Sequence, residues 1–292
     1  MKKMFFLLLA LCMISTVAIG EELYTIIDAL EYDDLVALQA YVTEKIEDID
    51  NAKEPAAVIE TRLSADRADQ ALIGEPVYIA EDNFVLTVEY AFHGTYADAL
   101  AKSFNSYNTR YGMEKGQEWV LVYLKLEGQG AANEKIDLSD WNFHIVDENG
   151  VDCGTSYIAD NPKQIRDMYG DSVQYAWYGL PVVKGARVSM IYQSNIYNAE
   201  TQYWFDLSAR YPVDTTNAVY PEIKLKSKDE LVFDIQMRLG EYGYMVYAPS
   251  GIYDTNTQNA MKKFQKKVGL KMTGLADEET LKILFTGNEL PE

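Results

Sequence analysis

Residues 251–270 read GIYDTNTQNAMKKFQKKVGL, and their spacing predicts a helix with one buried face. Apolar residues recur at steps of three and four, which is the period of a helix packed on one side. Gly269 ends the pattern, as a glycine at the C-terminus of a helix often does. We therefore expect an amphipathic helix over 256–268. Its inward positions are Ala260, Met261, Phe264 and Val268.

Two further helical patterns flank this stretch. The first covers 227–242, where Ser227 and Glu230 have the spacing of a capping box. The other begins near Asp277, with acidic residues in its first turn, where they favour the helix dipole. Three short helices in close succession predict a small three-helix bundle over 222–286.

The residues of this bundle follow a spaced pattern across all three helices. The residues that carry it are Gln236, Leu239, Gly243, Tyr244, Gly251, Ile252, Tyr253, Thr257, Ala260, Phe264, Gln265, Gly269, Leu270, Gly274, Asp277, Thr280 and Leu284. The pattern resembles the peptidoglycan-binding domain that bacterial wall hydrolases carry as an appendage, and it covers about 228 to 285. Ser250 departs from it, because that family usually has an aspartate before the glycine.

The resemblance implies non-covalent binding of peptidoglycan, so the polar and aromatic residues of the pattern are candidate contacts. Amides and hydroxyls can hydrogen-bond the peptide stem or the amino sugars, and a tyrosine ring can stack on a sugar face. Thr257 and Gln265 fit a role in bracing the helices equally well. The candidates are Gln236, Tyr244, Tyr253, Asn256, Thr257 and Gln265.

Four lysines lie on the predicted second helix, in a chain whose net charge is −19. They are Lys262, Lys263, Lys266 and Lys267. At about 100° per residue they fall on the outward flanks of the helix. Two interpretations stay open: a solvated face that favours solubility, or a source of long-range attraction to anionic wall polymers that salt would weaken.

From about Val77 the hydrophobic period changes from helical to strand-like. Runs such as NFVLTVEYAF and EWVLVYLKLEG are rich in β-branched and aromatic residues and are separated by glycine- and asparagine-containing turns. Asn149-Gly150 is a strong hairpin signal. The pattern predicts an antiparallel β-sandwich over 77–210. Within it, 97–111 is a polar and aromatic insertion, either a loop or a short helix.

Three segments of this region resemble immunoglobulin-like extracellular domains of Gram-positive bacterial proteins: GQEWVLVYLKLEG (116–128), WNFHIVDENG (141–150) and LPVVKGARVSMIYQ (180–193). The last of them is a predicted pair of strands joined at Lys184-Gly185. The resemblance covers about 77 to 207 and implies a secreted adaptor or interaction domain, without a site at the level of residues. The expected fold is therefore multidomain α and β: an immunoglobulin-like antiparallel sandwich followed by a three-helix bundle.

All four tryptophans fall in the predicted sandwich. Exposed aromatic rings on strands could form a platform for sugars, so a carbohydrate-binding sandwich is one interpretation. Trp119, however, alternates with Leu121 and Tyr123, which favours a core face. We expect the tryptophans to pack in the core. They are Trp119, Trp141, Trp177 and Trp204.

The first twenty residues, MKKMFFLLLALCMISTVAIG, have the basic start, apolar run and small residues of a secretory signal peptide. Cleavage after Gly20 would leave no membrane span, whereas a retained membrane anchor is the alternative. Leu11 precedes Cys12, where a lipoprotein signal requires a small residue, so lipid anchoring is not expected. Cys153 would then be the lone cysteine, and an internal disulfide could not form.

The remaining segments are a predicted amphipathic helix and connector over 21–76, a proline-containing linker over 211–221 and a tail over 287–292. The helix covers 31–50, and a packing role is favoured over a coiled coil because it has too few heptads. Residues 21–221 hold 14 basic and 34 acidic residues, whereas 222–285 hold ten and nine. This break in charge suggests two parts with different partners, and the acidic balance argues against nucleic acid.

The sequence offers little for an enzyme. His93 and His144 lie on separate predicted strands without a cluster of zinc ligands, Cys153 has no histidine near it in sequence, and a G-x-S-x-G elbow is absent. No cofactor is implied. We expect a secreted, non-catalytic, wall-associated protein whose partners are peptidoglycan and another extracellular protein at the sandwich. The alternative is a cell-wall hydrolase, or a regulator of one, with an unrecognised site in the sandwich.

Overall fold

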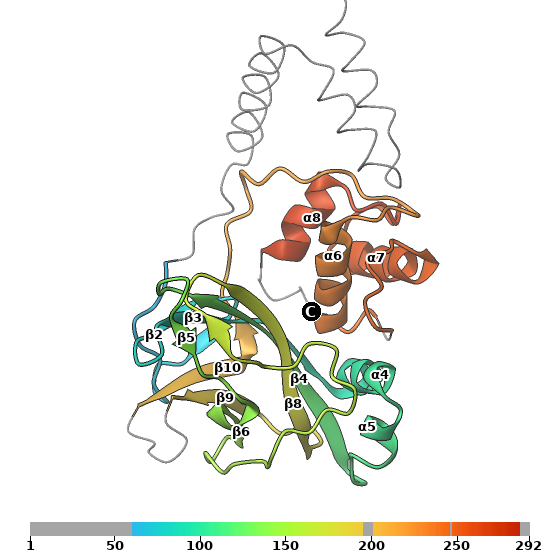
Figure 1. Cartoon of the computed structure of the whole chain (residues 1–292). Coiled ribbons are helices and arrows are strands. Elements are labelled where there is room, and N and C mark those ends of the chain that lie inside the picture. Colours follow the sequence, from blue (N-terminus) through green and yellow to red (C-terminus); the bar gives the residue numbers. More distant parts are fainter. Residues whose placement is uncertain (1–59, 195–200, 246, 287–292) are drawn as a thin grey trace, which may run out of the picture. The chain divides into compact units, whose positions relative to one another are not determined.

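The computed structural model describes residues 60–194, 201–245 and 247–286, which form two four-stranded β-sheets followed by the helices α6, α7 and α8 (Figure 1). The first sheet has the order β2-β3-β4-β8 and is antiparallel. The second has the order β1-β10-β9-β6 and is antiparallel except for the parallel pair β1 and β10. The predicted sandwich with helices after it is confirmed.

The strands have the following bounds: β1 Ala71–Ile73, β2 Val77–Ile79, β3 Phe84–His93, β4 Gln117–Gly128, β5 Lys135–Ile136, β6 Phe143–Asp147, β7 Met168–Tyr169, β8 Val173–Val183, β9 Val188–Gln193 and β10 Gln202–Arg210. The short strands β5 and β7 pair with each other outside the two sheets.

Three predicted features lie outside the described residues: the signal peptide over 1–20, the helix over 31–50 and the tail over 287–292. The described end of the segment predicted as a connector contributes β1 to the second sheet. Arg62 holds the chain there, because its guanidinium pairs with Asp69 at 2.8 Å. At three residues, β1 is too short to show a strand period in the sequence.

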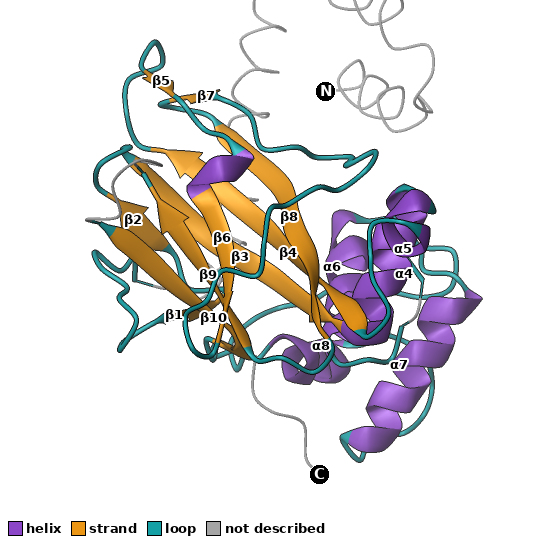
Figure 2. Ribbon diagram, turned by 90° about the horizontal axis from the view of Figure 1, so that it is seen from below, coloured by secondary structure: helices purple, strands orange, loops and turns teal. Residues whose placement is uncertain are grey.

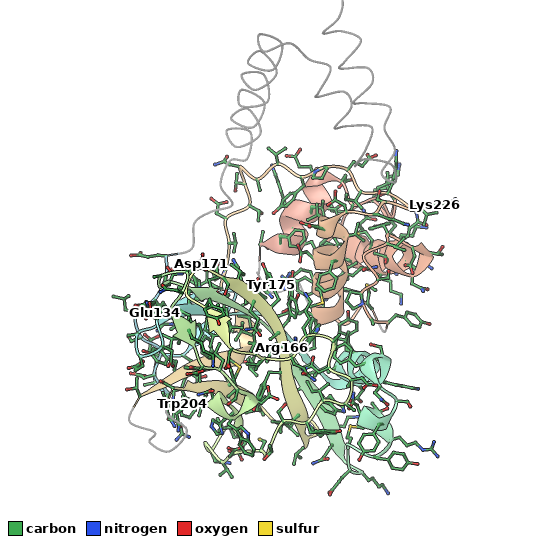
Figure 3. The ribbon with its side chains drawn as sticks, in the orientation of Figure 1. Glu134, Arg166, Asp171, Tyr175, Trp204 and Lys226 are labelled. Carbon is green, nitrogen blue, oxygen red and sulfur yellow. The ribbon has the colours of Figure 1, made fainter. Side chains whose placement is uncertain are left out.

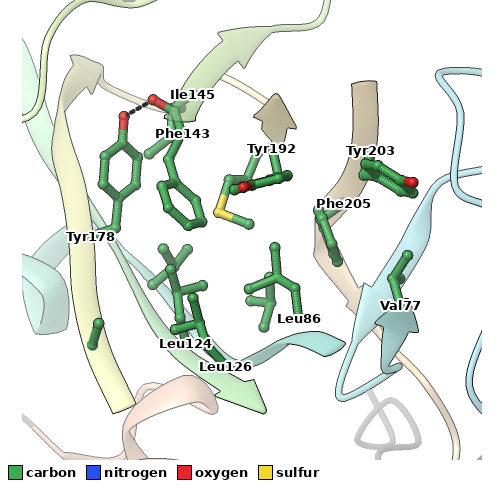
Figure 4. Close-up of a cluster of buried hydrophobic side chains, with 14 of the residues drawn as sticks. Val77, Leu86, Leu124, Leu126, Phe143, Ile145, Tyr178, Tyr192, Tyr203 and Phe205 are labelled. Carbon is green, nitrogen blue, oxygen red and sulfur yellow. Dashed lines mark hydrogen bonds between the residues drawn. The ribbon is translucent and has the colours of Figure 1, made fainter. Parts of the chain in front are cut away.

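The two sheets face each other across one apolar core (Figure 4). Alternate side chains of each strand point into it, since successive residues of a strand face opposite sides. Leu86 of the first sheet and Phe143, Tyr192 and Phe205 of the second are at most 2% exposed. Burial of each such side chain contributes about 1.5–3 kcal/mol. The Tyr178 hydroxyl donates to the Phe143 carbonyl at 2.5 Å, so this buried phenol is satisfied.

The tight turns predicted from the sequence are present. Asn149-Gly150 closes a turn in which the Gly150 N–H donates to the Asp147 carbonyl at 2.9 Å. Lys184-Gly185 joins β8 to β9, as expected. Both glycines have positive φ, 81° and 77°, a conformation that glycine adopts without a steric penalty.

The insertion between β3 and β4 is helical. It forms α4 (Gly94–Phe104) and α5 (Tyr107–Arg110), which settles the choice between a loop and a short helix. The apolar face of α4 is buried with aromatic residues from the outer face of the first sheet. The indole N–H of Trp119 donates to the carbonyl of Asn108 at 3.2 Å, which ties β4 to this insertion.

The C-terminal helices are α6 (Glu230–Glu241), α7 (Thr255–Lys267) and α8 (Glu278–Phe285). Each is capped by an aspartate, and such a cap contributes about 1 kcal/mol. The predicted capping box at Ser227 is wrong: Asp229 caps α6 by accepting from the Leu231 N–H at 2.9 Å. The Ser227 hydroxyl instead accepts from the N–H of Lys224, three residues before it, at 3.2 Å. The caps are Asp229, Asp254 and Asp277.

These helices share a core with the outer face of the first sheet (Figure 2). The Phe233 ring of α6 lies 6.0 Å from that of Tyr123 on β4, centroid to centroid. A Cβ built on Gly240 would lie 2.2 Å from the Tyr96 ring of α4, so only glycine allows this approach. The apolar face of the helices is therefore covered in part by strands.

The segment predicted as a linker lies against α8. The Val213 N–H donates to the Thr286 carbonyl at 2.7 Å, and the Thr215 hydroxyl donates to the Lys282 carbonyl at 2.8 Å. The Tyr220 ring stacks on Phe285 at 5.5 Å between centroids. This segment is thus held against α8 at Val213, Thr215 and Tyr220, although it has no regular secondary structure.

Candidate functional site

The loop before α7, residues 250–253, is held by the side chain of Gln236 on α6. The Gln236 carboxamide oxygen accepts from the N–H groups of Ser250 and Gly251 at 2.8 and 2.9 Å. Its nitrogen donates to the Ile252 carbonyl at 3.0 Å and to the Thr257 hydroxyl at 2.8 Å. The amide thus uses both its acceptor and its donors within the fold.

The same arrangement occurs a second time, between α7 and α8. Gln265 accepts from the Gly274 N–H at 2.8 Å and donates to the Leu275 carbonyl at 2.8 Å and to the Thr280 hydroxyl at 3.2 Å. In both copies the glycine has positive φ, an aspartate cap follows it by three residues, and the threonine follows the cap by three. The helical region therefore contains two equivalent glutamine-braced loops.

The segment 223–228 runs between the two loops and joins them. Ile223 exchanges backbone hydrogen bonds with Ala276 at 3.0 and 2.9 Å. Further along, the Lys226 N–H donates to the Tyr253 carbonyl at 2.8 Å. Lys226 has a positive φ of 75°, and its side chain is exposed (Figure 3). The loops and this segment thus make one hydrogen-bonded layer at the ends of α7 and α8.

Four of the six candidate contact residues are buried. Tyr253 and Thr257 have no exposed surface, and Gln236 and Gln265 are 1% exposed. The Tyr253 hydroxyl donates to the Gly274 carbonyl at 3.0 Å, so it links the two loops. In this conformation these four side chains shape the loops and present no surface to a polymer.

The other two candidates are accessible. Asn256 lies exposed in the first turn of α7, and Tyr244 is half-buried with its ring edge against Phe264. Desolvation raises the pKa of the Tyr244 phenol, which therefore stays a neutral hydrogen-bonding group. Asn256 lies close to the loop that Gln236 braces, whereas Tyr244 lies beside Phe264, further along α7.

Sequence reasoning missed apolar side chains that are exposed around this loop. Ile252 is 38% exposed, Leu225 is 42% exposed and Tyr247 is 58% exposed. All three lie outside the helices, so the helical periodicity of the sequence does not single them out. Together with Asn256 they provide both apolar and polar groups beside one rigid loop.

The four lysines lie on the outer side of α7, as predicted. Lys263, Lys266 and Lys267 are exposed, whereas Met261 and Phe264 are fully buried. Lys262 is half-buried, because its aliphatic part lies over Gly274, where an added Cβ would come within 2.8 Å of it. Among the described residues none of the four lysines has an ion-pair partner.

A buried ion-pair network fixes the C-terminal turn of α6 on the sandwich. The Glu241 carboxylate accepts from Arg210 of β10 at 2.8 Å and pairs with Arg238 on its own helix. Nearer the start of α6, Asp234 accepts from the Tyr90 hydroxyl at 3.2 Å, and desolvation raises the pKa of Asp234. Removing one partner of such a network would leave an uncompensated buried charge.

The side chains with potential for catalysis are His93, His144 and Cys153, and each has its own surroundings in the sandwich. Burial lowers the pKa of His93, whose Nε2 lies 3.3 Å from the Leu207 carbonyl oxygen. His144 lies beside Asp152, with 2.8 Å between Nδ1 and Oδ2. Cys153 is a free thiol whose pKa is raised by burial. Across the described ranges we find no group of three or more His, Cys, Asp or Glu side chains placed to hold a metal ion.

In the part of the chain that the structure describes, no helix combines the length and the apolar character that crossing a membrane requires.

Residues 228–284 match a family model described as “Putative peptidoglycan binding domain”. The match spans α6, α7 and α8 with both glutamine-braced loops, and it confirms the resemblance drawn from the spacing of residues. It supports binding of the cell wall by this part of the chain. No significant match was found among curated protein sequences.

Three solved structures are similar to the chain. The yjhA protein from Bacillus subtilis is 14% identical with a TM-score of 0.32, over 48% of this chain and 100% of its own. A “putative lipoprotein (ycdA)” from Bacillus subtilis is 10% identical with a TM-score of 0.32, over 66% of this chain and 58% of its own. An uncharacterised β-sandwich protein from Clostridium difficile 630 is 12% identical with a TM-score of 0.31, over 51% and 97%.

Proposed function

We propose that the protein is exported and attaches non-covalently to peptidoglycan through residues 222–286, without catalytic activity of its own. The observation that carries the proposal is the match of residues 228–284 to a peptidoglycan-binding family. In this proposal residues 1–20 are a signal peptide, residues 77–210 are a sandwich presented to another extracellular protein, and residues 211–221 connect the two parts.

The contact surface extends from the exposed rim of the loop that Gln236 braces to Tyr244 beside α7. Asn256 supplies a hydrogen-bonding amide, and the rings of Tyr244 and Tyr247 supply faces for sugars. The loop is held by a glutamine whose partners are all within the fold, so little conformational entropy would be lost when a glycan or peptide stem binds. Gln236, Tyr253, Thr257 and Gln265 act as positioning residues in this scheme.

The test is co-sedimentation of the purified chain with insoluble peptidoglycan. The whole chain is needed, because a fragment starting at residue 222 would lose the strands that cover its apolar face. We expect the protein to leave the supernatant. Replacing both Tyr244 and Asn256 with alanine should weaken the association about tenfold, which corresponds to about 1.4 kcal/mol.

Tyr157→Ala is the matched control, because this tyrosine is 68% exposed on the sandwich rather than on the helices. It should sediment like the unmodified protein. A chain that stays in the supernatant at low and moderate salt would overturn the anchoring proposal. Equal losses in the double variant and the control would overturn the choice of surface.

The absence of catalysis is tested separately. Incubation of the chain with the same peptidoglycan should release no soluble muropeptides above the level of a heat-denatured sample. Release that is lost in a His144→Ala variant would instead favour a hydrolase with its site in the sandwich.

A further inference from the structure

A cavity of about 320 Å³ lies at one edge of the sandwich, away from the helices α6 to α8. It is bounded by the 3-10 turn Asp140–Asn142, the start of β6 and the loop 152–156, with Tyr178 of β8 as an apolar wall. Its volume is at the lower end of the range for small-molecule sites, which is roughly 300–1,000 Å³. It therefore suits a ligand of mono- or disaccharide size.

Trp141 at this cavity differs from the other tryptophans. It is 62% exposed, whereas Trp119, Trp177 and Trp204 are at most 9% exposed. Among the described residues no aromatic ring or cation packs against its indole. The expectation that the tryptophans lie in the core is thus met by three of them, and the fourth leaves a large flat face open to solvent beside a cavity.

Some polar groups of the cavity have no hydrogen-bond partner among the described residues. Asp140 is exposed, and within the described part of the chain its carboxylate has no hydrogen-bond or ion-pair partner. Desolvation raises the pKa of this carboxyl. Asp152 is held on both oxygens, by the Gly154 N–H at 2.9 Å and by His144 Nδ1 at 2.8 Å. This contact orients the imidazole and leaves its Nε2 without a described partner.

The turn that carries Trp141 and Asp140 is held at both ends. Ser139 and Asn142 form a reciprocal capping box around it. The Asn142 amide nitrogen also donates to the carbonyls of Gln193 and Ser194 at 3.0 and 2.9 Å. The indole and the carboxylate are therefore presented by a rigid support rather than by a free loop, which limits the entropy lost when a ligand binds.

We propose that this cavity binds one pyranose unit of a glycan, with the sugar ring stacked on Trp141 and its hydroxyls donating to Asp140. His144 Nε2 would accept from or donate to a further hydroxyl. An aromatic face beside a few oriented polar groups is the combination that matches the apolar face and the polar edge of a sugar ring. Both oxygens of Asp152 already accept hydrogen bonds within the fold, so Asp140 and His144 Nε2 are the groups left to meet a ligand.

Two sources could supply such a ring: the amino-sugar strands of peptidoglycan, or a neutral hexose polymer outside it. The proposal does not depend on wall binding by the helices, because the cavity shares no residue with the loop around Gly251. Titration calorimetry with the purified chain separates the sources. One arm uses purified disaccharide repeats of peptidoglycan glycan strands without peptide, and the other uses maltotetraose.

At least one arm should show saturable binding with a dissociation constant in the micromolar to millimolar range. Trp141→Ala should weaken it about tenfold, and Asp140→Asn a fewfold, because the amide can still accept one hydrogen bond. Tyr111→Ala is the matched control. The exposed fraction of Tyr111, 64%, is similar to the 62% of Trp141, but Tyr111 does not line this cavity. It should leave binding unchanged.

Trp141 is mostly exposed, so its replacement should leave the far-UV circular dichroism and the melting temperature nearly unchanged, and a binding loss can then be assigned to the site. No heat of binding in either arm at millimolar saccharide would overturn the proposal. So would equal losses in the Trp141 and Tyr111 variants, which would indicate general adhesion to exposed rings.

Discussion

Loop 250–253 and loop 273–276 are built from the same parts: a glutamine on the preceding helix, a glycine with positive φ, an aspartate cap and a threonine. They differ in what covers them. Gly274 of the second loop is buried beneath the side chains of Gln258 and Lys262, whereas a Cβ on Gly251 of the first would meet nothing within 4 Å. The same set of residues therefore builds a covered loop in one place and an open loop in the other.

The largest effects on stability should come from replacing the two glutamines that brace the loops, one at a time. Gln236 makes five side-chain hydrogen bonds and Gln265 makes four. Because unsatisfied buried groups cost about 1–3 kcal/mol each and the loops can relax, Gln236→Ala should lower the free energy of unfolding by about 3 kcal/mol and Gln265→Ala by about 2 kcal/mol. Urea denaturation followed by circular dichroism measures both.

Gln258→Ala is the control for this pair, because its side chain forms no hydrogen bond with a described residue. It should change stability by less than about 0.5 kcal/mol. A Gln236 variant as stable as this control would show that the braced loop contributes nothing to the fold.

The glycines should separate the closed loop from the open one. Gly251→Ala needs only a left-handed backbone, at a cost of about 1 kcal/mol. Gly274→Ala needs the same conformation and also places its Cβ 2.6 Å from Gln258 and 2.8 Å from Lys262, so about 2 kcal/mol is expected. Thermal melts of the two variants give the order, and a Gly251 variant that is the less stable of the two would contradict the comparison.

The link between the loops should have a smaller effect. Tyr253→Phe removes the hydroxyl that donates to the Gly274 carbonyl while the ring stays in the core. A loss of about 1 kcal/mol is expected, since one buried acceptor is left unpaired. Tyr247→Phe, at an exposed ring of the same region, is the control and should not change the urea midpoint.

The lysines should affect stability least. Replacing Lys262, Lys263, Lys266 and Lys267 with glutamine should change the unfolding free energy by only about 0.3–1 kcal/mol, chiefly by removing Lys266 and Lys267 from the last turn of α7. If they attract the wall, peptidoglycan association at low salt should weaken in this variant and the difference should vanish at high salt. An unchanged association at low salt would exclude the electrostatic role.

The sequence predicted the repeating elements well. The strand pattern, the turns at Gly150 and Gly185 and the inward face of α7 follow from local periodicity and from glycine at positive φ. Asp229 was missed as a cap because Ser227 and Glu230 offered a competing box two residues earlier. Only the backbone course of 224–229 decides between the two, and that course depends on pairing with loop 250–253.

The candidate site was predicted less well, for a physical reason. Gln236 and Gln265 are of the residue type that contacts ligands, but in the fold their partners are backbone groups and hydroxyls of the loops, and the sequence alone does not show this pairing. Conversely, the exposed Trp141 could not be distinguished from the three buried tryptophans, because it lies in a 3-10 turn without a period of its own.

The parallel pairing of β1 and β10 has a mechanical consequence. A protein held at its C-terminal helices and pulled from the other end would be loaded through residue 60 on one side and residue 211 on the other. Because these two strands run parallel and side by side, such a load acts along them and strains their hydrogen bonds together, in shear. Antiparallel hairpins loaded at one end open bond by bond. The edge pair of the second sheet should therefore act as the clamp that resists extension.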